Sequence, residues 1–341
     1  MNNVIALKES RKVRRARLAA WAAVVAAAAV VIGAPAPGRA GALKAPRLEA
    51  GILEIAGTSA SENFALRLRE GEPGILQVVD GPTVFEFTRA DITRIELDAR
   101  SGDDIVRIDE TNGVFTNTIP TTIDGAAGDD TLLGGSGAET FRGGPGDDSI
   151  DGNRGADIAF MGSGEDTFIW NPGDGSDVVE GQPGNDTMLF NGANVAETVE
   201  LSADGHRLRF FRDPAAITMN TDSVERVIFK AFGGADVVTV DDLSGTDVDD
   251  VAIDLAVAGG GADNAVDSIT VKGTNHNDRI AVAGNALAVT VSGFAATVEL
   301  LRPEAAKDEL RIATFDGKDT VDSAGLAAGV IALFVDGILV P

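Results

Sequence analysis

Residues 125 to 169 form five consecutive nonapeptides with no gap between them, and each carries one apolar side chain at its eighth position. Those residues are Leu132, Phe141, Ile150, Ala159 and Phe168. The fourth position of every block is glycine: Gly128, Gly137, Gly146, Gly155 and Gly164. A glycine that tolerates positive φ, followed by one inward-pointing apolar residue, predicts a tight turn and a very short strand. Two such units make one 18-residue coil of a parallel β-roll.

A second pattern lies on both sides of the nonapeptides. Residues 92–109 align without gaps on 224–241, and the pattern returns around Asp278 and, in a weaker form, around Asp319. Each copy reads apolar-x-apolar, six residues, Asp, x, apolar, which predicts a strand, a turn and a strand. The aspartate corresponds to the sixth position of the nonapeptide. Longer coils of the same solenoid and a hairpin-built sandwich both fit this spacing.

Helical periodicity of useful length is missing after residue 42, because Gly/Asp turns recur too often. The predicted fold class is therefore all-β, with a parallel β-roll of nonapeptides flanked by β-rich strand-turn-strand repeats. We divide the chain into an N-terminal β-rich flank (43–122), a nonapeptide array (123–190) and a C-terminal β-rich repeat region (191–341).

The first 42 residues predict an export signal. A basic stretch at 8–17 precedes an apolar run from Leu18 to Ile32, and small residues follow at Ala40-Gly41-Ala42. We expect cleavage after Ala42, with cleavage after Ala40 as the second choice. Fifteen apolar residues are short for a membrane span of about 20. We therefore expect no stable membrane span once the signal is removed; an uncleaved anchor is the alternative.

The net charge limits the classes of molecule that the protein is expected to bind. The chain has 28 basic and 53 acidic residues; the first 42 hold seven and one of these, which leaves 21 against 52, a net charge of −31, in the remainder. Such a field argues against nucleic acid and anionic membrane surfaces and favours cations. The chain has no cysteine, so disulfides and thiolate-bound zinc are excluded.

The sixth position of each nonapeptide is acidic, and residues 18 apart should stack on the same edge. One column would hold Asp130, Asp148 and Asp166, and the other Glu139 and Asp157. Carboxylates about 4.8 Å apart in a dehydrated turn should repel one another, so a cation is expected there. Hard divalent cations fit best, because glycine-rich turns expose backbone carbonyls and the array contains no Cys or His.

These blocks resemble the haemolysin-type calcium-binding repeat of the RTX (repeats-in-toxin) family, whose consensus is Gly-Gly-x-Gly-x-Asp-x-apolar-x. The resemblance implies Ca²⁺ between neighbouring turns, held by sixth-position side chains and by carbonyls of the glycine-rich half. It therefore implies the ligands Asp130, Glu139, Asp148, Asp157 and Asp166, with carbonyls near Gly128, Gly137, Gly146, Gly155 and Gly164. The longer Glu139 should weaken its site. Asp177 and Asp186, in less regular turns, are expected to form weaker sites. The fifth-position residues Asp103, Asp129 and Asp147 are expected to be solvated.

We expect a secreted or cell-surface bacterial protein in which Ca²⁺ drives folding of the β-roll, with a structural or adhesive role. Its expected partners are calcium ions and, as candidates, cell-surface polysaccharide or protein. The alternative is a β-solenoid enzyme acting on extracellular polysaccharide, and a third hypothesis is a surface-layer component that needs no metal. Catalysis is not expected. His206 and His276 lie outside any His-Glu-x-x-His motif, no Gly-x-Ser-x-Gly elbow occurs, and tyrosine is absent.

Overall fold

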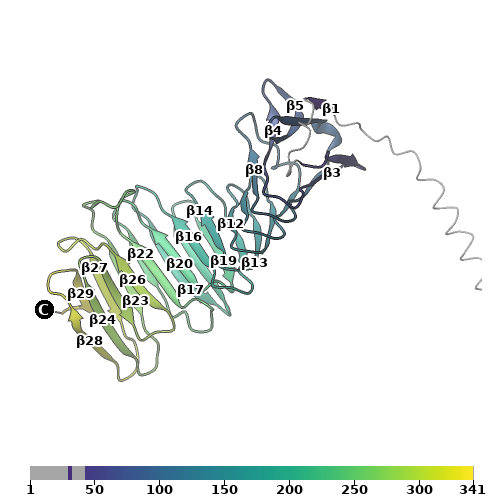
Figure 1. Ribbon diagram of the computed structural model, residues 1–341. Coiled ribbons are helices and arrows are strands. Elements are labelled where there is room, and N and C mark those ends of the chain that lie inside the picture. Colours follow the sequence, from purple (N-terminus) through teal and green to yellow (C-terminus); the bar gives the residue numbers. More distant parts are fainter. Residues whose placement is uncertain (1–29, 33–42, 341) are drawn as a thin grey trace, which may run out of the picture.

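The computed structural model describes residues 30–32 and 43–340, and within them the strands form two sheets of 15 strands each. Figure 1 shows the coils stacked along one axis into an elongated molecule. The described residues also contain one short 3-10 turn, η1 (Arg89–Asp91). The fold is all-β and matches the predicted β-roll or solenoid.

Neighbouring strands of each sheet are hydrogen-bonded in a spatial order that differs from their order along the chain. In the first sheet this order is β2 (Arg47–Glu49), β3 (Ile52–Ala56), β7 (Arg94–Asp98), β9 (Thr121–Asp124), β11 (Thr140–Pro145), β13 (Ile158–Ser163), β15 (Val178–Glu180), β19 (Ile217–Asp222), β18 (Arg207–Asp213), β17 (Thr198–Asp204), β21 (Val237–Val240), β23 (Ser268–Lys272), β27 (Glu309–Ala313), β29 (Ala332–Val335) and β30 (Ile338–Leu339). In the second sheet it is β1 (Val30–Ile32), β6 (Thr83–Thr88), β5 (Glu72–Asp80), β4 (Asn63–Arg69), β8 (Ile105–Asp109), β10 (Thr131–Leu133), β12 (Ser149–Asp151), β14 (Thr167–Trp170), β16 (Thr187–Asn191), β20 (Arg226–Lys230), β22 (Asp250–Asp254), β26 (Thr297–Leu301), β25 (Ala288–Ser292), β24 (Arg279–Asn285) and β28 (Thr320–Leu326).

The coils of the array have the predicted length. Leu132 of β10 pairs with Ile150 of β12, and Ile150 pairs with Phe168 of β14, always 18 residues apart and parallel. The next step is 20 residues, from Phe168 to Met188 of β16. The turn after β14 holds the two extra residues, and there the Trp170 Nε1–H donates to the Gly175 carbonyl at 2.8 Å. A small insertion in the turn therefore leaves the strand register intact.

Both flanks continue the two sheets. Strands β7 and β8 pair in parallel with β9 and β10, and β20 and β22 extend the second sheet beyond β16. Pairing thus runs on across residues 122 and 190. Three antiparallel meanders, β4–β5–β6, β17–β18–β19 and β24–β25–β26, are built into the sheets. The open choice between solenoid and sandwich resolves as a solenoid that carries hairpins.

The core is one thin layer between the sheets. All five eighth-position residues of the array are fully buried, as predicted. Trp170 stacks on Phe190 with ring centroids 4.0 Å apart, and Phe210 and Phe229 continue the cluster. Burying one large apolar side chain is worth about 1.5–3 kcal/mol, so repetition over many coils provides the main favourable contribution. The alternating burial along strands such as β16 and β20 follows from the period of two.

The predicted export signal and its cleavage sites lie outside the described residues, apart from Val30–Ile32, which pair antiparallel with β6. In the part of the chain that the structure describes, no helix has the length and apolar character needed to cross a membrane.

Candidate metal centre

Seven acidic residues that stand directly before strands of the second sheet are linked to one another from coil to coil, and we call them the first column. They are Glu62, Asp104, Asp130, Asp148, Asp166, Asp186 and Glu225. The backbone N–H of each of the first six donates to a carboxylate oxygen of the next acid, at 2.7 to 2.9 Å. The acids are therefore linked coil to coil by backbone N–H donors along the sheet edge.

The first sheet carries two shorter columns of the same construction. The second column is Glu139, Asp157 and Asp177, with N–H to carboxylate distances of 2.7 and 2.9 Å. The third column is Glu197, Asp236, Asp267 and Asp308, with distances of 2.8, 2.9 and 3.2 Å. Strands β18 and β19 lie between the strands that these two columns precede. The predicted site residues are thus brought together in columns, including Asp177 and Asp186 from the less regular turns.

The array acids share an electrostatic deficit. One oxygen of each carboxylate accepts a backbone N–H, while the other is buried and has no hydrogen-bond partner among the described residues. These oxygens are Oδ2 of Asp130, Asp148, Asp157, Asp166, Asp177 and Asp186, and Oε1 of Glu139. All seven side chains are at most 2% exposed. A buried polar oxygen without a partner costs about 1–3 kcal/mol, and more when charged, so the columns call for a neutralising group.

Glycine at the first position of the nonapeptide keeps a space open beside the unpaired oxygens. A Cβ on Gly143 would lie 2.4 Å from Oδ2 of Asp148 and 2.1 Å from the Met161 carbonyl oxygen. A Cβ on Gly125 would lie 2.4 Å from Oδ2 of Asp130 and 2.8 Å from the Gly143 carbonyl oxygen. Carboxylate and carbonyl oxygens thus face one small volume. An all-oxygen donor set of this kind fits Ca²⁺.

The fourth-position glycines serve the turns in two ways. Gly128, Gly146, Gly155 and Gly164 have φ between 128° and 146°, as the turn prediction requires. Gly137 is the exception, because its φ is outside the positive region. A Cβ there would lie 2.2 Å from the Thr116 carbonyl oxygen, so close backbone approach requires this glycine instead.

Burial raises the carboxyl pKa values along the columns. The pKa rises to about 7 at Asp130, Asp148, Asp177 and Asp186, and to about 9 at Asp157. Desolvation is the largest cause, neighbouring carboxylates add to it, and the backbone N–H donors oppose it. The pKa values of Glu139 and Asp166 are raised by the same desolvation. Without a cation the columns therefore favour protonated carboxyls.

The described residues contain no group of three or more His, Cys, Asp or Glu side chains placed to hold one metal ion. A cation at these columns would therefore need backbone carbonyls beside one or two carboxylates. Glu139 begins the second column, and its Oε2 accepts the Gly135 N–H at 3.0 Å in place of an N–H from a preceding column member.

Protein groups satisfy the acids at several column ends. Glu62 accepts the N–H of Thr58 at 3.0 Å as well as its hydroxyl. Arg212 lies in β18 and donates through Nε to Glu197 at 2.6 Å, with both side chains buried. Oδ2 of Asp308 accepts the Glu304 N–H at 2.6 Å. In the first and third columns the unpaired oxygens therefore lie in the interior, whereas in the second column they include both ends, Glu139 and Asp177.

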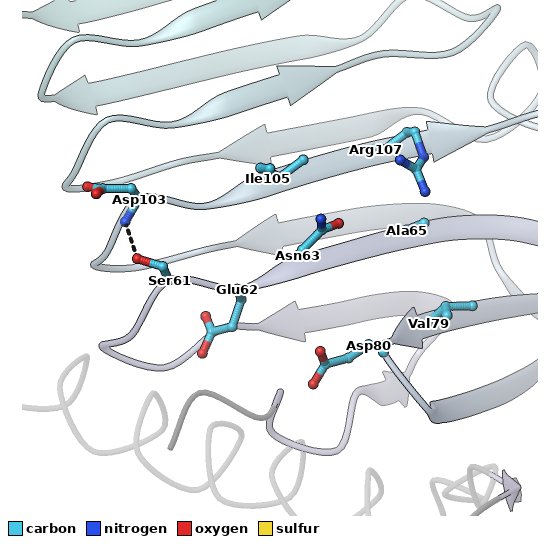
Figure 2. A pocket seen from close by; sticks show the side chains of 10 residues that line it. Ser61, Glu62, Asn63, Ala65, Val79, Asp80, Asp103, Ile105 and Arg107 are labelled. Atoms are coloured by element: carbon cyan, nitrogen blue, oxygen red, sulfur yellow. Dashed lines mark hydrogen bonds between the residues drawn. The ribbon is translucent and has the colours of Figure 1, made fainter. Parts of the chain in front are cut away.

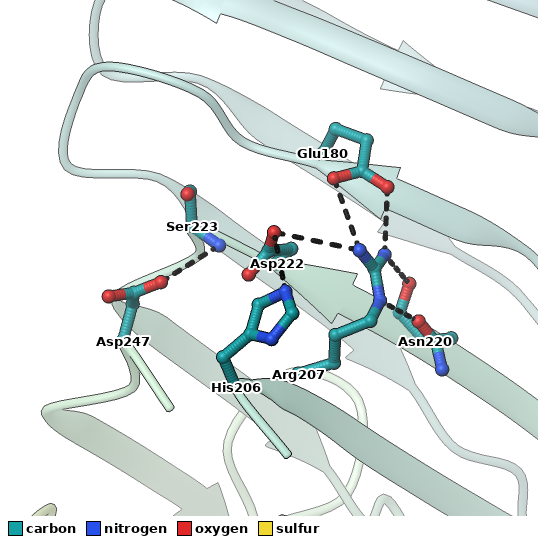
Figure 3. A network of polar contacts seen from close by, with 7 residues as sticks. All are labelled: Glu180, His206, Arg207, Asn220, Asp222, Ser223 and Asp247. Atoms are coloured by element: carbon teal, nitrogen blue, oxygen red, sulfur yellow. Dashed lines mark hydrogen bonds and ion pairs between the residues drawn. The ribbon is translucent and has the colours of Figure 1, made fainter. Parts of the chain in front are cut away.

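The second meander carries a further cation next to the array. Figure 3 shows Arg207 of β18 between Glu180 and Asp222, with Nη to Oε distances of 2.9 and 3.2 Å to Glu180 and an Nη1 to Oδ2 distance of 3.6 Å to Asp222. His206 lies beside it, with Nε2 3.5 Å from Asp222, and is largely exposed. This network attaches the meander to β15.

Sequence reasoning missed five column members: Glu62, Glu197, Glu225, Asp267 and Asp308. Loops of unequal length separate them, so a fixed repeat period does not find them. A local signal was present, because each reads acid-x-apolar-x-apolar, as in Asp267-Ser-Ile-Thr-Val. The fifth-position residues Asp103, Asp129 and Asp147 are exposed as expected, yet each accepts a backbone N–H from the next coil, and we call them the outer column.

A parallel β-roll with acidic, glycine-lined turns defines the class of protein, and comparison with known families agrees. The family model described as RTX calcium-binding nonapeptide repeat (4 copies) matches residues 122–138, 133–168 and 173–194. Residues 122–194 thus carry RTX-type calcium-binding nonapeptide repeats, and these repeats form the β-roll of the array. The third column lies beyond the matched residues.

Comparisons with curated proteins and with solved structures add no functional assignment. No curated protein matches the chain. Among solved structures, the extracellular lipase LipA from Serratia marcescens is 12% identical with a TM-score of 0.17, over 60% of this chain and 43% of the lipase. The chain thus spans less than half the length of that protein.

Proposed function

We propose that this is a secreted, non-catalytic protein in which Ca²⁺, bound between turns of the array, completes the folding of the solenoid and gives it a structural or adhesive role. The proposed ligands are the acids of the first and second columns within residues 123–190, together with carbonyls of the glycine-rich turns. The observation that carries the proposal is the row of buried carboxylate oxygens that lack a partner. Bound Ca²⁺ would supply the charge that the short coils lack.

The columns also suggest how binding and folding would be coupled. Each acid donates its N–H to one neighbouring coil, so an ion at one turn stiffens the ladder on which the next ion binds. A ligand that binds only the folded coils adds stability as RT ln(1 + [L]/Kd). An extracellular module with Kd near 10⁻⁴ to 10⁻³ M would remain open inside a cell and close outside it.

The test is thermal melting and circular dichroism of the protein in calcium, with magnesium as the ion control. We compare the wild type with Asp148→Asn. The amide keeps an oxygen for the Asp130 N–H but removes one buried charge. We expect a higher melting temperature than wild type without calcium and a smaller calcium-induced rise.

The matched control is Asp147→Asn, which removes the same charge one residue away at an exposed position. It should leave both values unchanged. Equal responses of the two variants, or no response of the wild type to calcium, would remove the basis of the proposal.

Export and catalysis need separate tests. Recovery of the protein from culture medium or the cell surface, with its N-terminus sequenced, tests secretion and the predicted signal. Reducing-sugar release from a panel of polysaccharides tests the alternative that the solenoid is an enzyme, and sustained release by the wild type would favour that alternative.

A further inference from the structure

The third column repeats the arrangement of the array outside the residues that the repeat model matches. Asp236 and Asp267 are at most 1% exposed, and Oδ2 of each is buried without a partner among the described residues. The Asp236 N–H donates to Oδ1 of Asp267 at 2.9 Å, so the two carboxylates belong to adjacent coils. Two neighbouring buried carboxylates have a deficit of the same kind as the array.

Acidic groups also surround this pair. Oδ2 of Asp263 accepts the Gly234 N–H at 3.1 Å, and Oε1 of Glu304 accepts the Asp263 N–H at 2.7 Å. Lys307 is the near cation, and its Nζ donates to the Asn264 carbonyl at 3.1 Å. The neighbouring column members have protein partners, since Glu197 pairs with Arg212 and Asp308 accepts the Glu304 N–H. The deficit is therefore confined to Asp236 and Asp267.

We propose that Asp236 and Asp267 bind a divalent cation, Ca²⁺ by preference, at a site in the C-terminal region separate from the nonapeptide array. Carboxylate oxygens from two adjacent coils supply the hard oxygen donors that this ion prefers. The ion would fix β21 to β23, beside the buried Arg212–Glu197 pair. This inference does not depend on calcium binding in the array.

Hydrogen exchange read by peptide mass spectrometry tests this site and the array separately. We compare the protein with and without calcium. The inference predicts at least tenfold slower exchange in peptides covering β21 and β23 on adding calcium. Slowing at β12 and β14 with none at β21 and β23 would overturn it while leaving the proposed function of the array intact. Slowing at β21 and β23 alone would support this inference and contradict calcium binding by the array.

A double variant, Asp236→Asn with Asp267→Asn, assigns the effect to these residues. Calorimetric titration should show at least one calcium ion fewer per protein, and the slowing at β21 and β23 should disappear while that at β12 and β14 remains. Asp242→Asn, an exposed charge after β21, is the control and should bind as the wild type does. An unchanged ion count in the double variant would overturn the inference, because it would show that these two carboxylates hold no ion. If the double variant does not fold, the exchange pattern of the wild type with and without calcium still tests the inference.

A second, independent observation concerns Leu43 and Asp80. The Leu43 nitrogen lies 3.0 Å from Oδ2 of Asp80, and both residues are less than 10% exposed. Figure 2 shows Asp80 at the end of β5, beside Glu62. Among the described residues, no Lys or Arg forms an ion pair with Asp80. A neutral amide leaves the charge of this buried carboxylate without a counter-ion.

We infer that the bond between Ala42 and Leu43 is hydrolysed during maturation, and that the new α-ammonium group of Leu43 pairs with Asp80. A signal-type endopeptidase would add water across the peptide bond, so that Ala42 leaves as a carboxylate and Leu43 becomes an ammonium group. The small residues Ala40-Gly41-Ala42 suit such cleavage. Processing would then supply the missing counter-ion and complete the N-terminal end of the solenoid.

The test uses the 341-residue chain, exported by a bacterial host. Sequencing of the exported protein should give Leu43 as the first residue; a start at Gly41 or an uncleaved chain would overturn the inference. A Gly-Ser pair inserted between Ala42 and Leu43 should lower the melting temperature when residue 80 is aspartate. The same insertion should have no effect in Asp80→Asn. Equal effects in both backgrounds would show that the ammonium group does not pair with Asp80.

Discussion

The array and the C-terminal region both line up buried acids along a sheet edge, but they neutralise them differently. In the array the acids follow at 18 or 20 residues, and each keeps one oxygen without a protein partner. In the third column they follow at 31 to 41 residues, and the longer connections bring in Arg212 and the backbone of Glu304. The longer connections therefore leave room for a partner from the chain itself at Glu197 and Asp308, whereas Asp236 and Asp267 in the same column still lack one.

The physical reason is that a short coil has few residues. A nonapeptide consists of a glycine turn, one acid and one buried apolar side chain, so no residue is left to place a Lys or Arg side chain beside the acid at the sheet edge. A meander such as β17–β18–β19 adds enough chain to carry Arg212 inside. The array should consequently depend on solution conditions, whereas the Arg212–Glu197 region should not.

The largest effect should come from pH in the absence of calcium. The pKa values of Asp130, Asp148, Asp177 and Asp186 are about 7 in the folded protein, above the ordinary 3.8. The folded state then binds more protons than the unfolded state, so the free energy of unfolding falls as pH rises from about 4 to about 7. One such group contributes about 1.4 kcal/mol per pH unit in this window. Urea denaturation at several pH values measures the slope.

Saturating calcium is the control for that experiment, since a bound cation holds the carboxylates ionised. The fall should become smaller, calcium affinity should rise with pH, and binding should release protons. Calcium-free stability that increases from pH 5 to pH 7 would contradict the buried, cation-free columns.

Arg212→Met should give the next largest effect, and one that calcium does not relieve. Removing the guanidinium leaves Glu197 buried without its partner, which typically costs about 3–5 kcal/mol. Urea denaturation with and without calcium should show the same loss. Arg226→Met is the matched control, because its pair with Asp250 is exposed and worth less than about 1 kcal/mol. Full rescue of the stability of Arg212→Met by calcium would contradict the proposed difference between the array and the Arg212–Glu197 region.

Gly143→Ala should destabilise the array through close contact alone. Its Cβ would lie 2.1 Å from the Met161 carbonyl oxygen, and its φ is not positive, so backbone strain does not enter. Overpacking of this kind costs about 1–3 kcal/mol, and the same methyl group would fill the proposed calcium cradle. Gly74→Ala in β5 is the control, since its Cβ meets nothing within 4 Å. Melting and calcium titration of both variants make the measurement.

How much of this could be read from the sequence depends on spacing. The fixed period placed Asp130, Asp148 and Asp166 in one column and Leu132, Ile150 and Phe168 in the core, because register is specified wherever one face is buried. Asp267 and Asp308 escaped, since loops and hairpins between them obey no period. The Arg212–Glu197 pair also escaped, because only the antiparallel meander brings those side chains together. Whether the flanks form a solenoid was undecidable from a strand-turn-strand pattern that hairpins share.

Asp129→Asn should have the smallest effect. It allows an exposed and a buried acid of the same turn, Asp129 and Asp130, to be compared. Asp129 is exposed and belongs to the outer column, where its Oδ1 accepts the Asp147 N–H at 2.9 Å. Water competes for that bond and screens the charge, so the change should stay within about 0.5 kcal/mol. Asp130→Asn, one residue away and buried, should strongly reduce the calcium response, as measured by melting over a calcium series. Because the two variants differ by one position and carry the same charge change, unequal responses would assign the ion to the buried oxygen. Equal calcium responses would instead make total charge, rather than burial, the controlling quantity and would contradict the assignment of the ion to the buried oxygens.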